Sequence, residues 1–443
     1  MAQGRHRPHG PRAGGHRRGR PRRGAGHEPR AHHDRRERQT RPGEHELRGA
    51  ALRRVAQGDV RGGPQEPRPR PPRLPLSGDA PVSALLDLPG ALARIALDAA
   101  TQTALGGDPS PPTPLATTPR DTVFEDCSAR VYRFRPAEGA PAAPRRPVLL
   151  VPSMINRWFV LDLRPGSSLA EALVASGLDV YLLDWGTPRD EDRFLSWPEV
   201  LDRLGRAVRF VRRSTGADGV GILGYCMGAT LSSIYAALHP EQVAALVNLA
   251  GPIDFSHAGM LGHMVDPRWF DVEAITDAGN LPAAQMQSGF SAMRPTLQLA
   301  KLVGQYDRLH VPGARQALDA IERWGNDNIP FPAAAYRTYI TELYQQNLLA
   351  RGEHRVRGRV ARLSDITCPV MAITAERDTI CPPAAALALL SLSGSSDTRA
   401  LSVPGGHVGA VVGSRASKEL YPAVAQWLRE RLDAPLPKTA ATE

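Results

Sequence analysis

The sequence contains few cysteines, and their spacing excludes the two commonest structural uses of the residue. Four cysteines are spread over 443 residues, and no pair shows the CxxC spacing of a zinc site. A disulfide-stapled secreted fold needs more cysteines in a far shorter chain. We therefore expect a reducing, cytoplasmic environment and predict neither a bound metal nor a cofactor.

Long hydrophobic runs are also missing. No uninterrupted apolar stretch reaches the roughly 18 residues of a membrane-spanning helix. The arginine-rich start lacks the apolar segment of a secretory signal. We therefore expect no membrane span and no export signal.

Large apolar residues are almost absent from the start of the chain. Residues 1–73 hold only five of them, and Phe, Ile, Trp and Tyr do not occur before residue 81. Residues 1–80 carry 20 arginines against eight acidic residues, whereas the rest of the chain holds 35 basic and 37 acidic residues. Such a segment cannot bury enough apolar surface to fold. We predict a disordered tail over 1–80, then a short helix and proline-rich linker over 81–120.

The basic tail raises the question of a nucleic-acid partner. A positively charged arm attracts polyanions. No aromatic residues alternate with the arginines, however, as they do where bases stack on a protein surface. The sequence therefore favours a solvated tail, and we expect no nucleic-acid partner.

From about residue 121 to residue 433 the pattern is that of one globular domain. Two early strands are predicted at 123–124 and 131–134, and short apolar runs then alternate with helical stretches. Strands that are apolar at successive positions, rather than at every second one, are buried on both faces. When helices separate such strands, they indicate a mostly parallel sheet covered on both faces, an α/β fold. The predicted strands lie at 148–151, 180–183, 220–223, 244–249, 370–374 and 400–403, and the helices near 168–176, 199–213, 227–238, 383–391 and 422–432.

Residues 255–350 interrupt this alternation. They show no clear strand but contain 10 of the 24 aromatic residues of the chain. An insertion of this size late in a sheet predicts a helical lid over an active site. An ordinary aromatic-rich helical subdomain is compatible with the same pattern.

A candidate nucleophile stands where a strand meets a helix. The strand at 220–223 leads into Gly224-Tyr225-Cys226-Met227-Gly228, a G-x-C-x-G sequence. Such an elbow forces its central residue into a strained turn, and the flanking glycines, Gly224 and Gly228, remove Cβ clashes. The side chain of Cys226 would stand at the helix N-terminus, where the dipole stabilises a thiolate.

Two further residues complete a catalytic triad. Asp378 and His407 follow the strands at 370–374 and 400–403, and an acid and then a histidine follow the nucleophile in this type of fold. We predict His407 as the base for Cys226 and Asp378 as the group that orients His407 or assists a second base step. The backbone N–H groups of Met227 and Met154 are the predicted oxyanion hole. Such a triad performs covalent acyl transfer, to water or to a hydroxyl group.

Several spaced segments together resemble polyhydroxyalkanoate synthases, a family of cysteine-dependent polymerases with the α/β-hydrolase fold. The resemblance covers roughly residues 119–433. It rests on TPRD (118–121), VYRF (131–134), VPSMINR (151–157), VLDL (160–163), LLDWGTP (182–188), GYCMG (224–228), Arg377-Asp378 and GHVG (406–409).

The resemblance implies a substrate, a product and partners. The substrate would be an (R)-3-hydroxyacyl-CoA, and the products a growing polyester and free CoA. Cys226 would carry the acyl group, His407 would act as its base, and Asp378 would help to activate the incoming hydroxyl. The chain resembles the short catalytic subunit of two-component synthases, which implies a non-catalytic partner subunit, a homo-oligomer and association with storage granules.

One departure from the family pattern keeps other functions open. The family's elbow usually ends in two glycines, but the second position here is Ala229. A methyl group at this position would crowd the backbone beside the nucleophile. A cysteine-dependent acyl-CoA hydrolase or acyltransferase is therefore an alternative, and a non-catalytic granule-associated protein is a second one.

Overall fold

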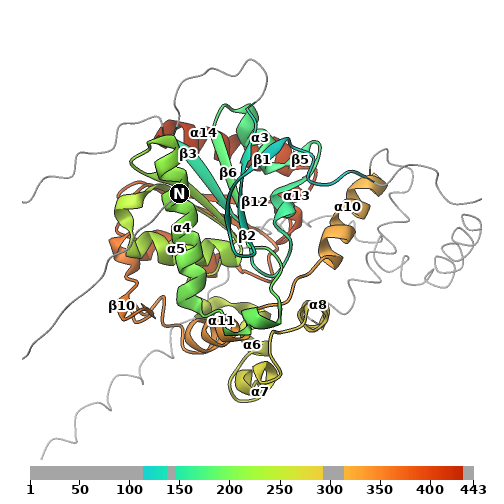
Figure 1. Ribbon diagram of the computed structural model, residues 1–443, viewed down its shortest axis with the longest axis vertical. Helices are drawn as coiled ribbons and strands as arrows, with labels where there is room; N and C mark the ends of the chain where they lie inside the picture. The colour runs from blue at the N-terminus through green and yellow to red at the C-terminus, as the bar shows by residue number, and fades with distance from the viewer. Residues whose placement is uncertain (1–112, 137–145, 293–313, 433–443) are drawn as a thin grey trace, which may run out of the picture. The chain divides into compact units, whose positions relative to one another are not determined.

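The computed structural model describes residues 113–136, 146–292 and 314–432. Its centre is an eight-stranded sheet in the order β1-β2-β6-β3-β7-β8-β11-β12 (Figure 1). The pairs β1–β2 and β2–β6 are antiparallel, and the other neighbours are parallel. The strands are β1 (Arg120–Asp126), β2 (Ala129–Phe134), β3 (Pro147–Val151), β6 (Asp179–Asp184), β7 (Val220–Tyr225), β8 (Val243–Leu249), β11 (Val370–Ala375) and β12 (Thr398–Val403).

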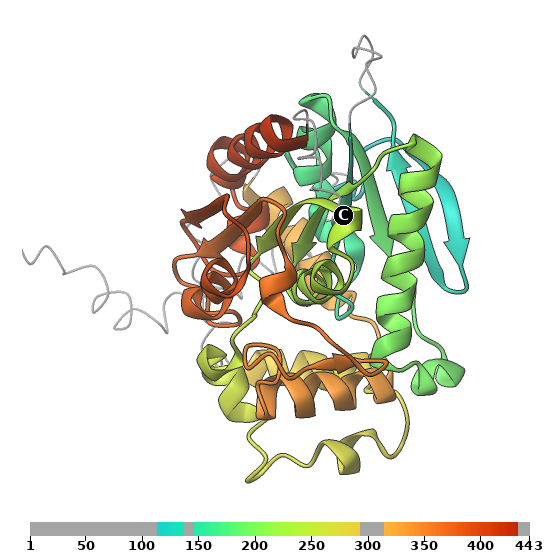
Figure 2. The same cartoon turned by 90° about the vertical axis from the view of Figure 1, so that its left-hand side faces the viewer.

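Helices cover both faces of the sheet (Figure 2). One face packs against α4 (Trp197–Thr215), α5 (Met227–Leu238) and α12 (Pro383–Leu392), and the other against α3 (Leu169–Ala175), α13 (Gly409–Val412) and α14 (Tyr421–Leu432). Successive side chains of a strand point to opposite faces, so Leu149 and Val151 enter one core while Val148 and Leu150 enter the other. The predicted mostly parallel α/β sheet is confirmed, and its apolar runs are unalternating because both faces are buried.

The segment between β8 and β11 is mainly helical, as the sequence indicates. The described helices α6, α7, α8 and α11 gather at one end of the sheet in Figures 1 and 2. Two isolated bridges, Asn156 with Asn328 and Leu281 with Phe331, tie this segment together and to the loop after β3. Its elements are η4 (Phe255–His257), α6 (Gly259–Met264), α7 (Val272–Thr276), α8 (Ala283–Ala292), α10 (Ala314–Asn326), α11 (Ala333–Thr338) and the π-helix η5 (Tyr339–Gln345).

Several short elements have no counterpart in the sequence analysis, because two to five residues are too few to show a period. Among them β4 (Asp162–Arg164) carries the buried Asp162, whose carboxylate accepts hydrogen bonds from Thr118 at 2.5 Å and Ser168 at 2.7 Å. The remaining short elements are η1 (Trp158–Leu161), β5 (Ser167–Ser168), η2 (Asp190–Phe194), η3 (Pro240–Gln242), β9 (Arg355–Val356), β10 (Arg359–Val360), η6 (Leu363–Asp365) and η7 (Ala416–Leu420).

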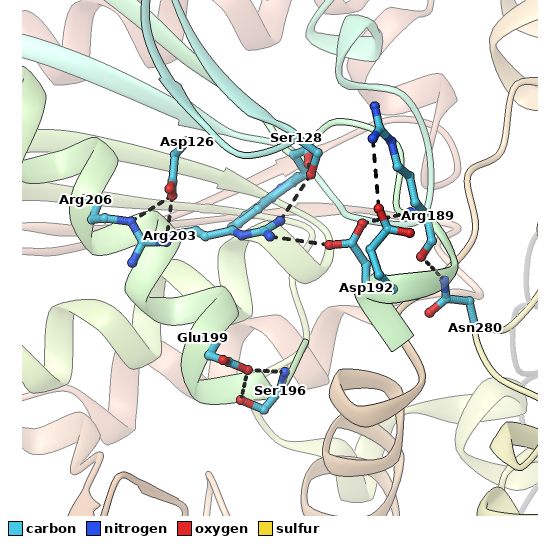
Figure 3. Close-up of polar contacts among 11 residues, drawn as sticks. Asp126, Ser128, Arg189, Asp192, Ser196, Glu199, Arg203, Arg206 and Asn280 are labelled. Atoms are coloured by element: carbon cyan, nitrogen blue, oxygen red, sulfur yellow. Dashed lines mark hydrogen bonds and ion pairs between the residues drawn. The ribbon is translucent and has the colours of Figure 1, made fainter. Parts of the chain in front are cut away.

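Buried charge fixes helix α4 to the antiparallel edge of the sheet (Figure 3). Arg203 is 8% exposed and reaches both Asp192 of η2, at 3.5 Å, and the Ser128 hydroxyl of the β1–β2 turn, at 3.3 Å. One turn further along α4, Arg206 pairs with Asp126 at 2.7 Å. These contacts attach the middle of α4 to η2 and to the β1–β2 hairpin.

Three predictions lie wholly or partly outside the described residues. These are the tail over 1–80, the helix and most of the linker over 81–120, and part of the insertion over 255–350. Among the residues that are described, no helix is long and apolar enough to cross a membrane.

Candidate active site

Cys226 occupies a strained turn between β7 and α5. Its backbone has φ 56° and ψ −129°, outside the regions that residues with a side chain prefer. A conformation of this kind costs about 1–3 kcal/mol and persists only where the surroundings impose it. The N–H of Cys226 donates to the Leu249 carbonyl of β8 at 2.9 Å, which holds the turn in place.

The two flanking glycines leave room for this turn. A Cβ at Gly224 would collide with the backbone of Ala229 in the first turn of α5. A Cβ at Gly228 would collide with the carbonyl oxygens of Val151 and Pro152 in the segment after β3. Glycine at both positions therefore lets three pieces of backbone meet around Cys226.

The structure brings the three predicted triad residues together from three separate loops. His407 Nδ1 lies 2.7 Å from Asp378 Oδ2, and Cys226 is near enough to the ring to raise the pKa of the imidazole. The other oxygen of Asp378 accepts the backbone N–H groups of Ile380 and Cys381, both at 2.9 Å. The carboxylate is thus fixed from both sides and faces the ring of His407.

His407 is held in its charged form by its neighbours. Burial by itself lowers the pKa of this imidazole, but the charge and hydrogen bond of Cys226 together with Asp378 outweigh burial and raise it. The ring of Tyr225 stacks against His407 at a centroid distance of 5.2 Å. Cys226 and Asp378 thus both favour the protonated imidazole at this position.

The predicted oxyanion donors lie on the two segments that meet at Gly228. Met227 is the first residue of α5, directly after Cys226, and Met154 lies in the loop after β3. Both side chains are buried, and the next residue of the loop, Ile155, donates its N–H to Ser153 Oγ at 3.2 Å. The first N–H groups of a helix lack partners within the helix, which suits them to bind an oxyanion.

A cavity of about 60 Å³ lies beside Cys226 and is mostly apolar. Eight of its wall residues come from the inserted segment, among them Tyr336, Tyr339 and Tyr344, and none of the eight is in the sequence-based site. Cys381 also lines it, but burial raises the pKa of this thiol well above its usual range, so it stays protonated. The other wall residues are Ile155, Pro252, Leu261, Val265, Met286, Phe331, Ile340 and Ile380.

Comparisons with known families agree with this geometry. Residues 146–413 match the α/β hydrolase fold family, and residues 112–173 match the N-terminus of poly-beta-hydroxybutyrate polymerase (PhaC). The first match spans more than half of the chain and contains Cys226, Asp378 and His407.

Individual proteins similar to this chain show which family within the α/β hydrolase fold it belongs to. The chain is 35% identical to the poly(3-hydroxyalkanoate) polymerase subunit PhaC of Allochromatium vinosum, covering 71% of this chain and 89% of that protein. This chain belongs to the PhaC polymerase family. The proteins of the same name from Haloferax mediterranei and Synechocystis are 32% and 34% identical over 74% and 71% of this chain, covering 67% and 85% of their own lengths.

The elbow of this PhaC-family chain accommodates its unusual alanine. Ala229 is fully buried, and its methyl group faces Gly251, where an added Cβ would collide with it. The absence of a side chain at Gly251 therefore makes room for the methyl group, which removes the crowding that Ala229 was expected to cause. Among the described residues, no cluster of three or more His, Cys, Asp or Glu could hold a metal ion.

Proposed function

We propose that the chain polymerises (R)-3-hydroxyacyl-CoA into polyester and releases CoA, with Cys226 as the residue that carries the acyl group. One observation carries the proposal. In a chain of the PhaC family, a strained elbow presents a cysteine to a histidine that is itself hydrogen-bonded to a buried aspartate.

In the first half-reaction, the Cys226 thiolate attacks the thioester carbonyl of the substrate. The N–H groups of Met227 and Met154 stabilise the oxygen that becomes negative. The carbon–sulfur bond to CoA then breaks, and the departing thiolate takes a proton from His407. Attacking and leaving groups are both sulfur, so acyl transfer between them is nearly balanced in energy.

In the second half-reaction, a hydroxyl group attacks the Cys226 thioester. Neutral His407 accepts the hydroxyl proton, an ester bond forms, and Cys226 leaves as a thiolate. We assign Asp378 to orientation and stabilisation of His407, because its second oxygen is already bound by the N–H groups of Ile380 and Cys381.

The inserted segment is proposed as the lid of this site. The cavity beside Cys226 takes most of its wall from this segment. We propose that parts of the segment move outward to admit the polyester chain. We further propose a non-catalytic partner subunit, a homo-oligomer and attachment to storage granules, as the family resemblance implies.

Incubation of the purified chain with (R)-3-hydroxybutyryl-CoA tests the function. We expect the wild-type chain to release CoA and form polymer, both alone and with an added partner subunit. Cys226→Ala should neither release CoA nor form polymer. Cys127→Ser is the matched control, because Cys127 is an exposed thiol in the β1–β2 turn. Release of CoA with only free hydroxy acid would point to a hydrolase, and no release under any condition would point to a non-catalytic protein.

A further inference from the structure

A buried polar chain links helix α4 to the inserted segment. Trp197 Nε1 donates to His354 Nε2 at 3.2 Å, and His354 Nδ1 lies 2.8 Å from Glu342 Oε2. Trp197 and His354 are both 0% exposed, and they stand 157 residues apart in the sequence. None of the three is part of the triad, so the mechanism gives them no role.

The chemistry of these groups fixes the tautomer of His354. A tryptophan N–H can only donate, so Nε2 of His354 must accept and carry no proton. The proton then sits on Nδ1 and is donated to Glu342. His354 is therefore neutral: it accepts a hydrogen bond from Trp197 and donates one to Glu342. These two hydrogen bonds fix the orientation of the Trp197 indole.

The indole of Trp197 in turn supports the wall of the cavity beside Cys226. Its ring stacks on Tyr339 with centroids 5.4 Å apart and an interplanar angle of 23°. Tyr339 lines the cavity and packs edge-on against Tyr344, with the ring centroids 5.3 Å apart. A displacement of Trp197 would thus be passed to two wall residues.

Trp197 is well placed to act as a fixed support. It is the first residue of α4, and a capping box at the helix start joins Ser196 and Glu199 (Figure 3). Glu199 Oε2 accepts from the Ser196 backbone N–H at 2.8 Å and from its hydroxyl at 2.6 Å. The capping box thus orders the first turn of α4, which contains Trp197, while the Trp197 ring stacks on Tyr339 of the inserted segment.

We propose that Trp197, held by His354 and Glu342, is a positioning residue that fixes Tyr339 and so sets the shape of the acyl cavity beside Cys226. The effect of Trp197 on catalysis rests on the proposed function. The effect of Trp197 on access to Cys226 does not, because the shape of the cavity also governs how large a reagent can reach Cys226.

The first experiment compares two thiol reagents on the full-length chain. Iodoacetamide is small and N-phenylmaleimide is bulky, and modification of the Cys226 peptide is followed by mass spectrometry. We expect Trp197→Leu to change the ratio of the two rates by about 10-fold, because displacement of a wall by about 1 Å has effects of this size or larger. Trp197→Phe keeps a ring against Tyr339 and should change the ratio less.

Trp427→Leu is the matched control. Trp427 is also 0% exposed, but it lies in α14 in the other core, and its Nε1 has no hydrogen-bond partner in the described structure. The proposal requires the ratio in Trp427→Leu to stay at the wild-type value. An unchanged ratio in Trp197→Leu, or an equal change in both variants, would overturn it.

Variants of Glu342 supply a second measurement that does not depend on the folding of Trp197→Leu. The Glu342 side chain is 35% exposed, so its replacement is compatible with folding. Glu342→Ala should shift the reagent ratio and raise KM for (R)-3-hydroxybutyryl-CoA more than it lowers kcat, whereas Glu342→Gln keeps an acceptor for His354 and should restore both. Equal behaviour of the two variants would contradict the proposal. If the wild type releases no CoA, the proposed function fails and the reagent ratio still decides the positioning role.

Discussion

At the scale of single residues, the site depends on what is missing around Cys226 as much as on what is present. Gly224 and Gly228 keep side chains out of the space in which the elbow, helix α5 and the segment after β3 meet. Gly251 does the same for Ala229. The geometry of the nucleophile is therefore enforced by close backbone packing.

Substitution of Gly228 by alanine tests this packing. The added methyl group would meet the carbonyl oxygens of Val151 and Pro152, so we expect a loss of about 1–3 kcal/mol in the free energy of unfolding and a lower kcat. Gly325→Ala is the matched control, because Gly325 lies in helix α10 with no atom within 4 Å of the new Cβ. Denaturant unfolding should show Gly325→Ala neutral or more stable by up to about 1 kcal/mol. Equal effects of the two variants would contradict the account.

The charge state of His407 gives a second test at this scale. Burial lowers the pKa of this residue, whereas Cys226 and Asp378 raise it and prevail. Cys226→Ala removes one of the two groups that raise this pKa, so the pKa of His407 should fall. An NMR titration of the imidazole in wild type and Cys226→Ala measures the change, and an unaltered or higher pKa in the variant would show that no thiolate–imidazolium pair exists.

At the scale of elements, the start of helix α4 connects the sheet to the cavity wall. Arg203 and Arg206 fix the helix to η2 and to the β1–β2 hairpin, and the capping box of Ser196 and Glu199 defines its first turn. Trp197 is the first residue of this helix, so the placement of α4 also places the Trp197 side chain. A helix that lies on the sheet thereby determines the location of a ring that packs beside the active site.

Loss of the capping box should weaken this element. Glu199→Ala removes the acceptor for the Ser196 N–H, and we expect a loss of about 0.3–1.5 kcal/mol in the free energy of unfolding. The hydrogen bond with Ser196 lowers the pKa of Glu199, so this contribution is present at neutral pH and is lost as the pH falls through the lowered value. Urea unfolding at neutral and acidic pH measures it. A Glu199→Ala deficit that is as large in acid as at neutral pH would refute this reasoning.

At the scale of the whole molecule, the sequence predicts the sheet better than it predicts the walls of the site. The central strands could be found because each is a short apolar run buried on both faces, whereas β12, which precedes His407, is mostly exposed. Cys226, Asp378 and His407 could be predicted because each follows a predicted strand. The contacts of Trp197 with His354 and Tyr339 could not, since they join residues far apart in the chain and leave no local pattern. The tyrosines of the cavity are visible in the sequence only as part of an aromatic-rich segment.

The most direct test of the account is the mass of the peptide that contains Cys226. The wild-type chain is mixed with (R)-3-hydroxybutyryl-CoA, quenched rapidly in acid, digested and examined by mass spectrometry. We predict a hydroxybutyryl thioester on Cys226, and its absence in Cys226→Ala. An acyl group on another residue, or CoA release without any acylated Cys226 in the quenched wild type, would contradict the central claim that Cys226 carries the acyl group.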